Sequence, residues 1–578
     1  MKPRILIDLR HYSKALFSAD LMAGLVVGIV ALPLAIAFAI AASPGGDAEH
    51  TIGPGIGIIT AIVAGLIISL FGGSRVQIGG PTGAFIIIIY GIVAKFGLSG
   101  LLVATILAGV MLVLMGVFRL GSVIKFIPYP IVVGFTSGIA LTIFTTQVKD
   151  LLGLTLEGGA PAAFIDKWMC YFRNITTLQW DAVAVSAVSI AIIVACTRWM
   201  KRLPGSLIAI IVTTATVYFT NQSGLTHVAT IGDRFGNITA SLPHINAFHL
   251  DWKSLFTDAQ GHFTFNTLSA LFPSAFVIAI LGAIESLLSA TVADGVTGDH
   301  HDSNQELIGQ GIANIVAPFF GGIPATGAIA RTMANINNGA RTCIAGVVHA
   351  LVLLVIFIVA MPLAAYIPMP TLAGVLVVVS YNMSQWRTFA QLTHRPKSDV
   401  VVLLVTFVLT VVFDLTIAIE LGLVLACLLF MRRMAEVTQL SIFTKEIDPN
   451  ADPVADIPLH EEALVIPDGV EVYEINGPFF FGVANRFEEM TAEMQDHPAI
   501  RIIRMRRVPF IDSTGVHNLE NLCLMSQRDG TQIILSGVQP KVRAVLERAG
   551  FPALIGEDNI CSHITIALER AAALRAKA

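Results

Sequence analysis

Long apolar runs separated by short polar stretches fill roughly the first three quarters of the chain. A helix of about 20 apolar residues crosses the hydrocarbon core of a bilayer. Several runs are short or interrupted by Gly and Pro, so hydropathy alone also allows twelve spans. The pattern favours fourteen membrane-spanning segments, near residues 20–42, 53–72, 76–96, 98–117, 128–148, 180–198, 204–220, 268–292, 304–319, 325–340, 342–363, 370–385, 398–414 and 416–434.

The positions of Lys and Arg in the short loops support an even number of spans. Residues 1–19 form a basic amphipathic lead, which we expect to be cytoplasmic. Positive charge in short loops favours the cytoplasmic side, and fourteen spans place both chain termini there. The long loops 149–179 and 221–267 then lie outside, the second as a partly ordered cap. The inner loops would contain Arg75, Arg119, Lys125, Arg198, Lys201, Arg202, Arg387, Arg395, Lys397, Arg432 and Arg433.

Charged residues become frequent from about residue 440. Alternating strand and helix patterns predict a small, mainly parallel sheet with covering helices. We expect a linker over 436–460 and a soluble α/β domain over 461–578. Its candidate strands are 470–476, 501–505 and 531–536, and its candidate helices are 483–495, 513–527, 540–549 and 561–574.

Composition agrees with a membrane protein and excludes several other classes. Of 578 residues, 55% are hydrophobic and 13% are charged, so one polar surface could not cover the apolar interior. The net charge of −4 argues against a nucleic-acid partner. The six cysteines form no CxxC, so we expect no zinc site and no cofactor. No phosphate-binding G-x-x-x-x-G-K-[ST] motif or catalytic constellation indicates an enzyme.

Two segments of the membrane part resemble each other. Residues 71–84 read FGGSRVQIGGPTGA, and residues 320–328 read FGGIPATGA. They lie in the third and tenth predicted spans, and a repeat of seven spans inverts its second copy. Inverted repeats with Gly/Pro-interrupted spans at matching positions are typical of secondary transporters.

A helix that starts inside the membrane exposes unpaired N–H groups, which attract anions together with the helix dipole. Proline suits a first helical turn, glycine lets a ligand approach the backbone, and threonine adds a hydroxyl. A single small-residue motif would favour tight helix packing, but two matching copies seven spans apart favour an anion site. The residues concerned are Gly79, Gly80, Pro81, Thr82, Gly83, Pro324, Thr326 and Gly327.

Glu285 and Arg331 are charged residues within predicted spans. A carboxylate in a membrane is costly and therefore functional or paired, which makes Glu285 a candidate proton carrier. Ser289 shares its helix face one turn later. Arg331 follows Gly327 by one turn and could place positive charge beside an anion. The alternative is that Arg331 extends to water or pairs with Glu285.

Two other polar groups are interpreted as structural. Gln147, Lys149 and Asp150 end the fifth span and mark its membrane boundary. His300, His301 and Asp302 form a polar cluster in the loop after the eighth span. We interpret this cluster as a solvated loop rather than a metal site.

The chain resembles the SulP family, the bacterial relatives of the solute carrier 26 anion transporters, along nearly its whole length. The similar stretches include DLMAGLVVGIVALPLAIAFAIA, FIPYPIVVGFTSGIALTIFTTQVKDLLG and GAIESLLSATVADGVTGDHHDSNQELIGQGIANIVAPFFGGIPATGAIART. The sequence of these stretches is most similar to the DauA-type C4-dicarboxylate branch.

This resemblance implies a 7+7 inverted repeat within 20–435. The core spans would cover about 20–118 and 268–363, and the gate spans about 119–222 and 366–435. The resemblance implies that the anion lies between the half-helices at Thr82, Gly83, Ala84, Gly327 and Ala328. We add Phe85, Thr326 and Arg331 to these candidate substrate-binding residues. Sodium-coupled bicarbonate members have Asp and Thr where this chain has Glu285 and Ser289. This difference favours coupling to a proton over sodium.

The C-terminal part resembles a STAS domain, with VEVYEINGPFFFG as its first strand and turn and IDSTG at residues 511–515. In related anti-sigma antagonists the serine at the Ser513 position is phosphorylated. In this chain we favour Ser513 as a helix N-cap, with a regulatory role as the alternative.

Taken together, these features predict a proton-coupled importer of a C4-dicarboxylate such as succinate, in the bacterial inner membrane. The core would move like an elevator against the gate of a homodimer, and the STAS domain would be cytoplasmic. Sulfate or bicarbonate transport, the latter coupled to sodium, remains an alternative. Less favoured are a nucleobase–proton symporter and a membrane sensor that signals through the STAS domain.

Overall fold

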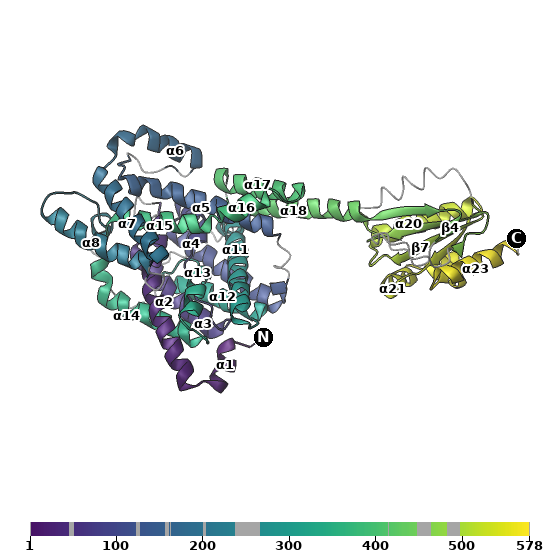
Figure 1. The fold of residues 1–578 in the computed structure, drawn as a ribbon, viewed down its shortest axis with the longest axis horizontal. Helices are drawn as coiled ribbons and strands as arrows, with labels where there is room; N and C mark the ends of the chain where they lie inside the picture. Colours follow the sequence, from purple (N-terminus) through teal and green to yellow (C-terminus); the bar gives the residue numbers. More distant parts are fainter. Residues whose placement is uncertain are drawn as a thin grey trace. The chain divides into compact units, whose positions relative to one another are not determined.

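The computed structural model describes residues 2–44, 51–122, 128–156, 161, 163–199, 204–236, 266–413, 415–447, 464–481 and 498–576. The chain divides into two compact units, Met1–Ala426 and Cys427–Ala578 (Figure 1). The first is a bundle of apolar helices, and the second is a sheet with helices.

All fourteen predicted spans contain helix. The long helix α4 (Ile86–Val117) covers two of these spans. It is interrupted between them at Gly97, which adopts a φ of 68°. The other spans correspond to α2 (Lys14–Ala41), α3 (Pro54–Phe71), α5 (Tyr129–Leu152), α7 (Trp180–Trp199), α8 (Gly205–Gln222), α11 (Asn266–Thr297), α12 (Ser303–Val316), α13 (Ile329–Asn337), α14 (Ile344–Ala364), α15 (Met369–Met383), α17 (Lys397–Val412) and α18 (Leu415–Val437).

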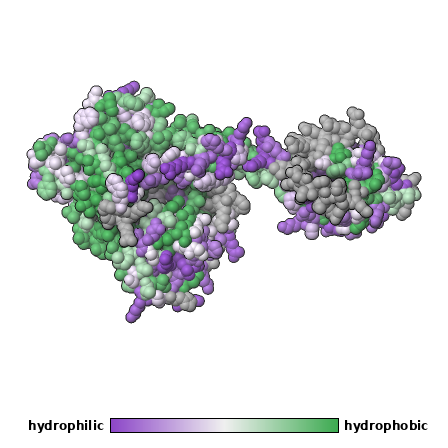
Figure 2. All heavy atoms as spheres, viewed as in Figure 1, coloured by the Kyte–Doolittle hydropathy of each residue, from purple (hydrophilic) through white to green (hydrophobic). Residues whose placement is uncertain are grey.

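Within the described part of the chain, seven helices are long and apolar enough to cross a membrane individually. Others, such as α12 and α13, are too short for this. The outer face of the first unit is largely apolar (Figure 2). Large side chains such as Phe219 and Val359 are exposed there, as expected of a surface solvated by lipid.

The helices of the first unit pack in two groups, which are called core and gate below. In the core, α12 packs against α4, and α14 packs against α2 and α3. A Cβ on Gly109 would lie 2.7 Å from the Gly311 carbonyl oxygen, so glycine permits the close crossing of α4 and α12. In the gate, α5 packs against α15 and α17, and α7 against α8 and α15.

Polar side chains fix the antiparallel packing of α5 and α15. Ser137 Oγ donates a 2.6 Å hydrogen bond to the Ser384 carbonyl, and Ser380 Oγ donates to the Ala140 carbonyl at 2.8 Å. These bonds satisfy hydroxyl groups where lipid offers no partner. They also align the residues of both helices that face the core.

Short helices lie outside the predicted spans: α1 (Arg4–Asp8), α6 (Phe164–Arg173), α9 (Ile231–Phe235) and α16 (Trp386–Leu392). α2 begins at Lys14 and takes in the last residues of the predicted lead. Of the predicted outer cap 221–267, residues 237–265 lie outside the described residues, and residues 266–267 begin α11.

The second unit contains a five-stranded sheet in the order β3–β6–β7–β8–β9. The strands β6 to β9 pair in parallel, and β3 pairs antiparallel with β6. The helices α20 (Ser513–Arg528), α21 (Pro540–Arg548), α22 (Phe551–Ile555) and α23 (Ile564–Arg575) accompany it. The strands are β3 (Gln439–Phe443), β6 (Val470–Asn476), β7 (Ile500–Arg507), β8 (Gln532–Ser536) and β9 (Ile560–Cys561).

The sheet begins earlier along the chain than expected, because the predicted linker 436–460 contains β3 and β4 (Glu446–Ile447). β4 pairs with β5 (Leu464–Val465) in a separate two-stranded ladder. The predicted helix over 483–495 lies outside the described residues.

Buried carboxylates hold two chain reversals of the core. Glu306 Oε2 accepts hydrogen bonds from the Gly73 and Ser74 amides at 2.8 and 3.0 Å, and Gln310 donates to its other oxygen. Asp20 accepts bonds from the Arg341 and Thr342 amides at 2.7 and 3.1 Å. Each carboxylate satisfies backbone donors that would otherwise be unpaired in an apolar interior.

Replacing Glu306 with Ala should therefore destabilise the core by about 3 kcal/mol, because two backbone donors and one amide lose their acceptor. The matched control is Glu436→Ala, since Glu436 forms only an exposed pair with Arg432 and should cost less than about 0.5 kcal/mol. Thermal unfolding of the purified protein measures both. Equal midpoints for the two variants would contradict a structural role for Glu306.

Candidate functional site

The two echoed segments meet at the centre of the core. β1 (Gly79–Gly80) pairs antiparallel with β2 (Thr326–Gly327), with Gly79 opposite Gly327 and Gly80 opposite Thr326. Gly80 has a φ of 148°, and a Cβ there would lie 2.5 Å from Arg331 Nη1, so glycine is required. The pairing places two helix starts beside each other.

One helix start is a 3₁₀ turn, Gly83–Phe85, that continues into α4, and the other is the start of α13. Thr82 and Ala328 are the extended residues immediately before them. The prediction that Pro81 and Pro324 occupy first helical turns is therefore wrong. Both prolines lie before the helices, in extended chain that reaches the β-pairing.

A cavity of about 310 Å³ lies where these helix starts face the gate. Several of its lining residues, including Asn382 and Gln385, are exposed, so the cavity reaches the surface there. It is lined by Leu34, Phe38, Thr82, Gly83, Ala84, Thr136, Glu285, Gly327, Ala328, Ile329, Ala330, Arg331, Val379, Asn382, Met383 and Gln385.

Glu285 reaches this cavity from α11. Its Oε2 accepts a 3.0 Å hydrogen bond from Thr82 Oγ1, so the carboxyl group is joined to the first helix start. Among the described residues, this is the one hydrogen bond of the Glu285 carboxylate, whereas Glu306 accepts three. Glu285 thus retains acceptor capacity toward the cavity.

Arg331 lies one turn into α13 and is only 2% exposed. Its Nη2 donates to the Pro81 carbonyl of the opposite half-helix, and Nη1 has no hydrogen-bond partner. No ion pair joins it to Glu285 within the described chain, which removes the predicted alternative of a direct pair. The guanidinium therefore supplies positive charge where the two half-helices meet.

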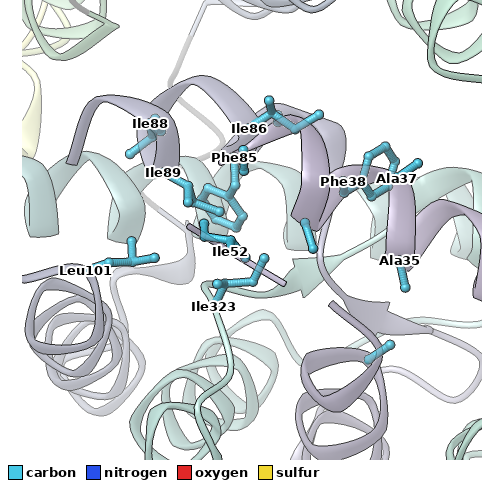
Figure 3. Close-up of a cluster of buried hydrophobic side chains, with 14 of the residues drawn as sticks. Ala35, Ala37, Phe38, Ile52, Phe85, Ile86, Ile88, Ile89, Leu101 and Ile323 are labelled. Atoms are coloured by element: carbon cyan, nitrogen blue, oxygen red, sulfur yellow. The ribbon is translucent and has the colours of Figure 1, made fainter. Parts of the chain in front are cut away.

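Three of the predicted site residues do not line the cavity. Phe85 is fully buried and packs among Ile52, Ile86 and Ile89 (Figure 3). Thr326 bonds Ser286 Oγ at 2.6 Å and the Gly282 carbonyl. Ser289 donates to Thr332 Oγ1 at 3.1 Å, so its hydroxyl fixes α11 to α13. These three side chains pack or form hydrogen bonds inside the core and do not line the cavity.

The backbone donors on the second half-helix also differ from those expected. The Gly327 amide donates to Ser286 Oγ at 3.2 Å, and the Ala328 amide donates to the Ile78 carbonyl at 2.9 Å. Neither N–H is available to an anion. The donors that remain are the first N–H groups of α13 itself, which have no intrahelical partner.

The gate contributes residues that sequence analysis did not select. Thr136 comes from α5, and Asn382 from α15, while Gln385 follows α15 with a φ of 43°. Asn382 is a polar residue at the end of an apolar run, and this sequence pattern could have identified it as a candidate site residue. The left-handed backbone at Gln385 has no sequence signature.

The other candidate site residues, Ser513, His301 and Asp302, lie in local hydrogen-bonded arrangements. Ser513 is exposed as the first residue of α20, and the N-cap is Asp512, whose Oδ1 accepts from the Gly515 amide at 2.8 Å. The N-cap prediction for Ser513 is therefore wrong by one residue. His301 Nδ1 lies 2.6 Å from Asp294, and Asp302 caps α12. Among the described residues, no cluster of three or more His, Cys, Asp or Glu could hold a metal ion.

Gly327→Ala should disrupt the meeting point of the half-helices. Its Cβ would overlap the Gln77 amide and lie 3.2 Å from Ser286 Cα, which should cost about 1–3 kcal/mol. The control is Gly91→Ala, where a Cβ meets nothing within 4 Å. Thermal unfolding and anion uptake both serve as readouts, and unchanged values for Gly327→Ala would contradict the tight packing described here.

Comparison with known proteins agrees with this architecture. Residues 17–406 match the sulfate permease family, and residues 463–567 match the STAS domain. The Bacillus subtilis protein YvdB is 39% identical over 96% of this chain and 98% of its own length. The bicarbonate transporter BicA of a Picosynechococcus strain is 29% identical over 92% of this chain and 90% of its own.

Solved structures show the same fold. The transmembrane domain of a cyanobacterial bicarbonate transporter BicA has a TM-score of 0.59 at 28% identity, covering 72% of this chain and 98% of that one. The murine solute carrier 26 family member A9 anion transporter, in an inward-facing state, has a TM-score of 0.83 at 19% identity, covering 99% and 94%. The chain therefore belongs to the sulfate permease family and is a polytopic helical membrane protein with a C-terminal STAS domain.

Proposed function

We propose that this protein is a secondary active transporter that binds one small divalent anion between its two half-helices. The observation that carries the proposal is the cavity at the core–gate boundary, which two helix N-termini and Arg331 border together with Glu285. Helix N-termini recognise charge through the backbone. A site at the boundary of inverted repeats is suited to alternating access.

The charges around the cavity favour a dianion accompanied by a proton. Each helix N-terminus acts as about half a positive charge, and Arg331 adds one more. The total of about two positive charges balances a dianion when Glu285 is protonated. An ionised Glu285 would cancel about half of this positive charge, so binding of the dianion favours uptake of a proton.

Sulfate and a C4-dicarboxylate such as succinate both satisfy this charge requirement. A Stylosanthes hamata relative named high affinity sulfate transporter 1 is 25% identical over 95% of this chain, which supports sulfate. The sequence resemblance to the C4-dicarboxylate branch supports succinate. The cavity of about 310 Å³ accommodates either anion.

Bicarbonate transport is a second candidate, favoured by the likeness to BicA over most of the chain. Bicarbonate carries one charge, so it would suit a site in which Glu285 is ionised or binds a cation. Sodium coupling is less favoured, because the Ser289 hydroxyl is bonded to Thr332 and does not line the cavity.

Transport would proceed by movement of the core against the gate. A Cβ on Gly83 would lie 2.9 Å from Met383 Sδ and 3.5 Å from Ile143 Cδ1, so the core lies close to the gate at this residue. We place the end that carries Arg387 in the cytoplasm of a bacterium, together with the termini and STAS domain. The STAS domain would regulate the transporter or stabilise a homodimer.

Glu285→Gln should abolish the pH dependence of anion uptake, because glutamine resembles the protonated acid but cannot release a proton. Wild-type uptake should rise by up to about tenfold per unit as the outside pH falls, since one proton joins the binding equilibrium. The assay is uptake of sulfate, succinate or bicarbonate into proteoliposomes between acidic and alkaline pH.

The control is Asp181→Asn, which removes an exposed carboxylate at the start of α7 and should keep the wild-type profile. An unchanged pH profile in Glu285→Gln would refute proton coupling at this residue. Uptake inhibited by uracil, and by none of the three anions, would instead indicate a nucleobase carrier.

A further inference from the structure

A second polar cavity, of about 80 Å³, lies along the same core–gate boundary. The core contributes the C-terminal end of α2 and Tyr90 of α4. The gate contributes the C-terminal end of α5, the start of α15, and residues of α6. Its charged lining residues are Lys149, Asp150, Lys167 and Arg234.

The small cavity lies at the opposite end of this boundary from the substrate cavity. On α5, Thr136 lines one cavity and Lys149 lines the other, which corresponds to about 20 Å along a helix. On α15, residues from Met369 to Leu376 line the second cavity, and residues from Val379 to Met383 line the substrate cavity. Core residues that move along the gate would therefore travel from one cavity toward the other.

Positive charge exceeds negative charge at this second cavity. Arg234 Nη1 lies 3.3 Å from Asp150 Oδ1, so these two charges form an ion pair. Lys149 and Lys167 form no ion pair or hydrogen bond with any residue that the structure describes. Two cations are thus left to face a polar cavity that also includes Ser43 and Thr146.

Lys167 is the more unusual of the two, because it is 4% exposed. Its Nζ lies 5.0 Å from the centre of the Tyr90 ring, and among the described residues this cation–π contact is the favourable interaction of the ammonium group. Burial without a counter-charge lowers the pKa of Lys167 to about 8. The charged ammonium group of Lys167 is therefore poorly stabilised while it is buried against Tyr90.

The contact between Lys167 and Tyr90 crosses the core–gate boundary. α6 packs against α5 and α17 and so belongs with the gate, whereas Tyr90 lies on α4 of the core. Movement of the core would separate the ring from the ammonium group. An anion that enters the opened cavity could then replace the ring as the partner of Lys167.

We propose that Lys149 and Lys167 form a second anion-binding site, which receives the transported anion when the core–gate boundary opens at that end. Tyr90 holds the Lys167 ammonium while this end is closed. The anion then passes to the half-helices. Together with Arg331, their positive charge is about as large as that of Lys149 and Lys167. This inference rests on the proposed anion transport and adds the site at which the anion is first bound from one side.

The test compares Lys167→Gln with Arg173→Gln, an exposed cation on the same helix. Uptake of sulfate, succinate and bicarbonate is measured in right-side-out and in inverted vesicles, and KM is determined for whichever anion the wild type carries. Lys167→Gln should raise KM roughly tenfold on one face only, because one positive charge a few ångströms from the anion is lost. Lys167→Arg should restore KM to within about threefold of the wild type.

Several outcomes overturn the inference. Equal KM values for Lys167→Gln and Arg173→Gln on both faces would contradict it while leaving anion transport intact. A KM raised equally on both faces would indicate a structural effect of Lys167. If the wild type carries none of the three anions, the proposed function itself fails, and the second site fails with it.

Discussion

Every backbone N–H and C=O group inside a bilayer requires a partner within the protein, and the rest of this structure depends on how that requirement is met. Two spans are interrupted in the middle, which would leave extended chain unpaired. The chain resolves this by pairing the interruptions with each other, Gly79–Gly80 against Thr326–Gly327. Asn314 completes the arrangement, because its side-chain amide bonds both the N–H and the C=O of Ala325.

This solution leaves the first N–H groups of the two half-helices without side-chain caps at residues that line the cavity. The amides of Gly327 and Ala328 are bonded within the core, whereas the helix starts beyond them are not closed by side-chain caps. The carboxylates of the core also fall into two groups. Glu306 and Asp20 each accept two backbone N–H groups together with side-chain donors and hold chain reversals, while Glu285 accepts one hydroxyl and keeps acceptor capacity toward the cavity. The carboxylates that hold chain reversals therefore differ in their hydrogen bonds from the carboxylate that lines the cavity.

Much of the fold follows from the sequence, because hydropathy, Lys/Arg placement and the Phe-Gly-Gly and Thr-Gly-Ala echo are local signals. The echo identified the half-helices, and Glu285 and Arg331 were found as isolated charges in apolar runs. The orientation of a side chain at a helix start is not a local property. Phe85 and Thr326 lie beside cavity residues in the sequence but point into the core, because α11 packs against them. The gate residues Thr136 and Gln385 depend on packing between distant helices, which one sequence does not reveal.

The central claim is that the anion lies between the two half-helices, and substrate protection of a cysteine at Ala328 tests it most directly. Ala328 precedes α13 and lines the cavity. In a background with Cys170 and Cys427 replaced by Ser, Ala328→Cys is treated with a maleimide in the presence of sulfate, succinate or bicarbonate. The account predicts that the transported anion slows labelling, with a concentration dependence that follows its transport KM. Labelling at the same rate with a saturating transported anion would contradict it.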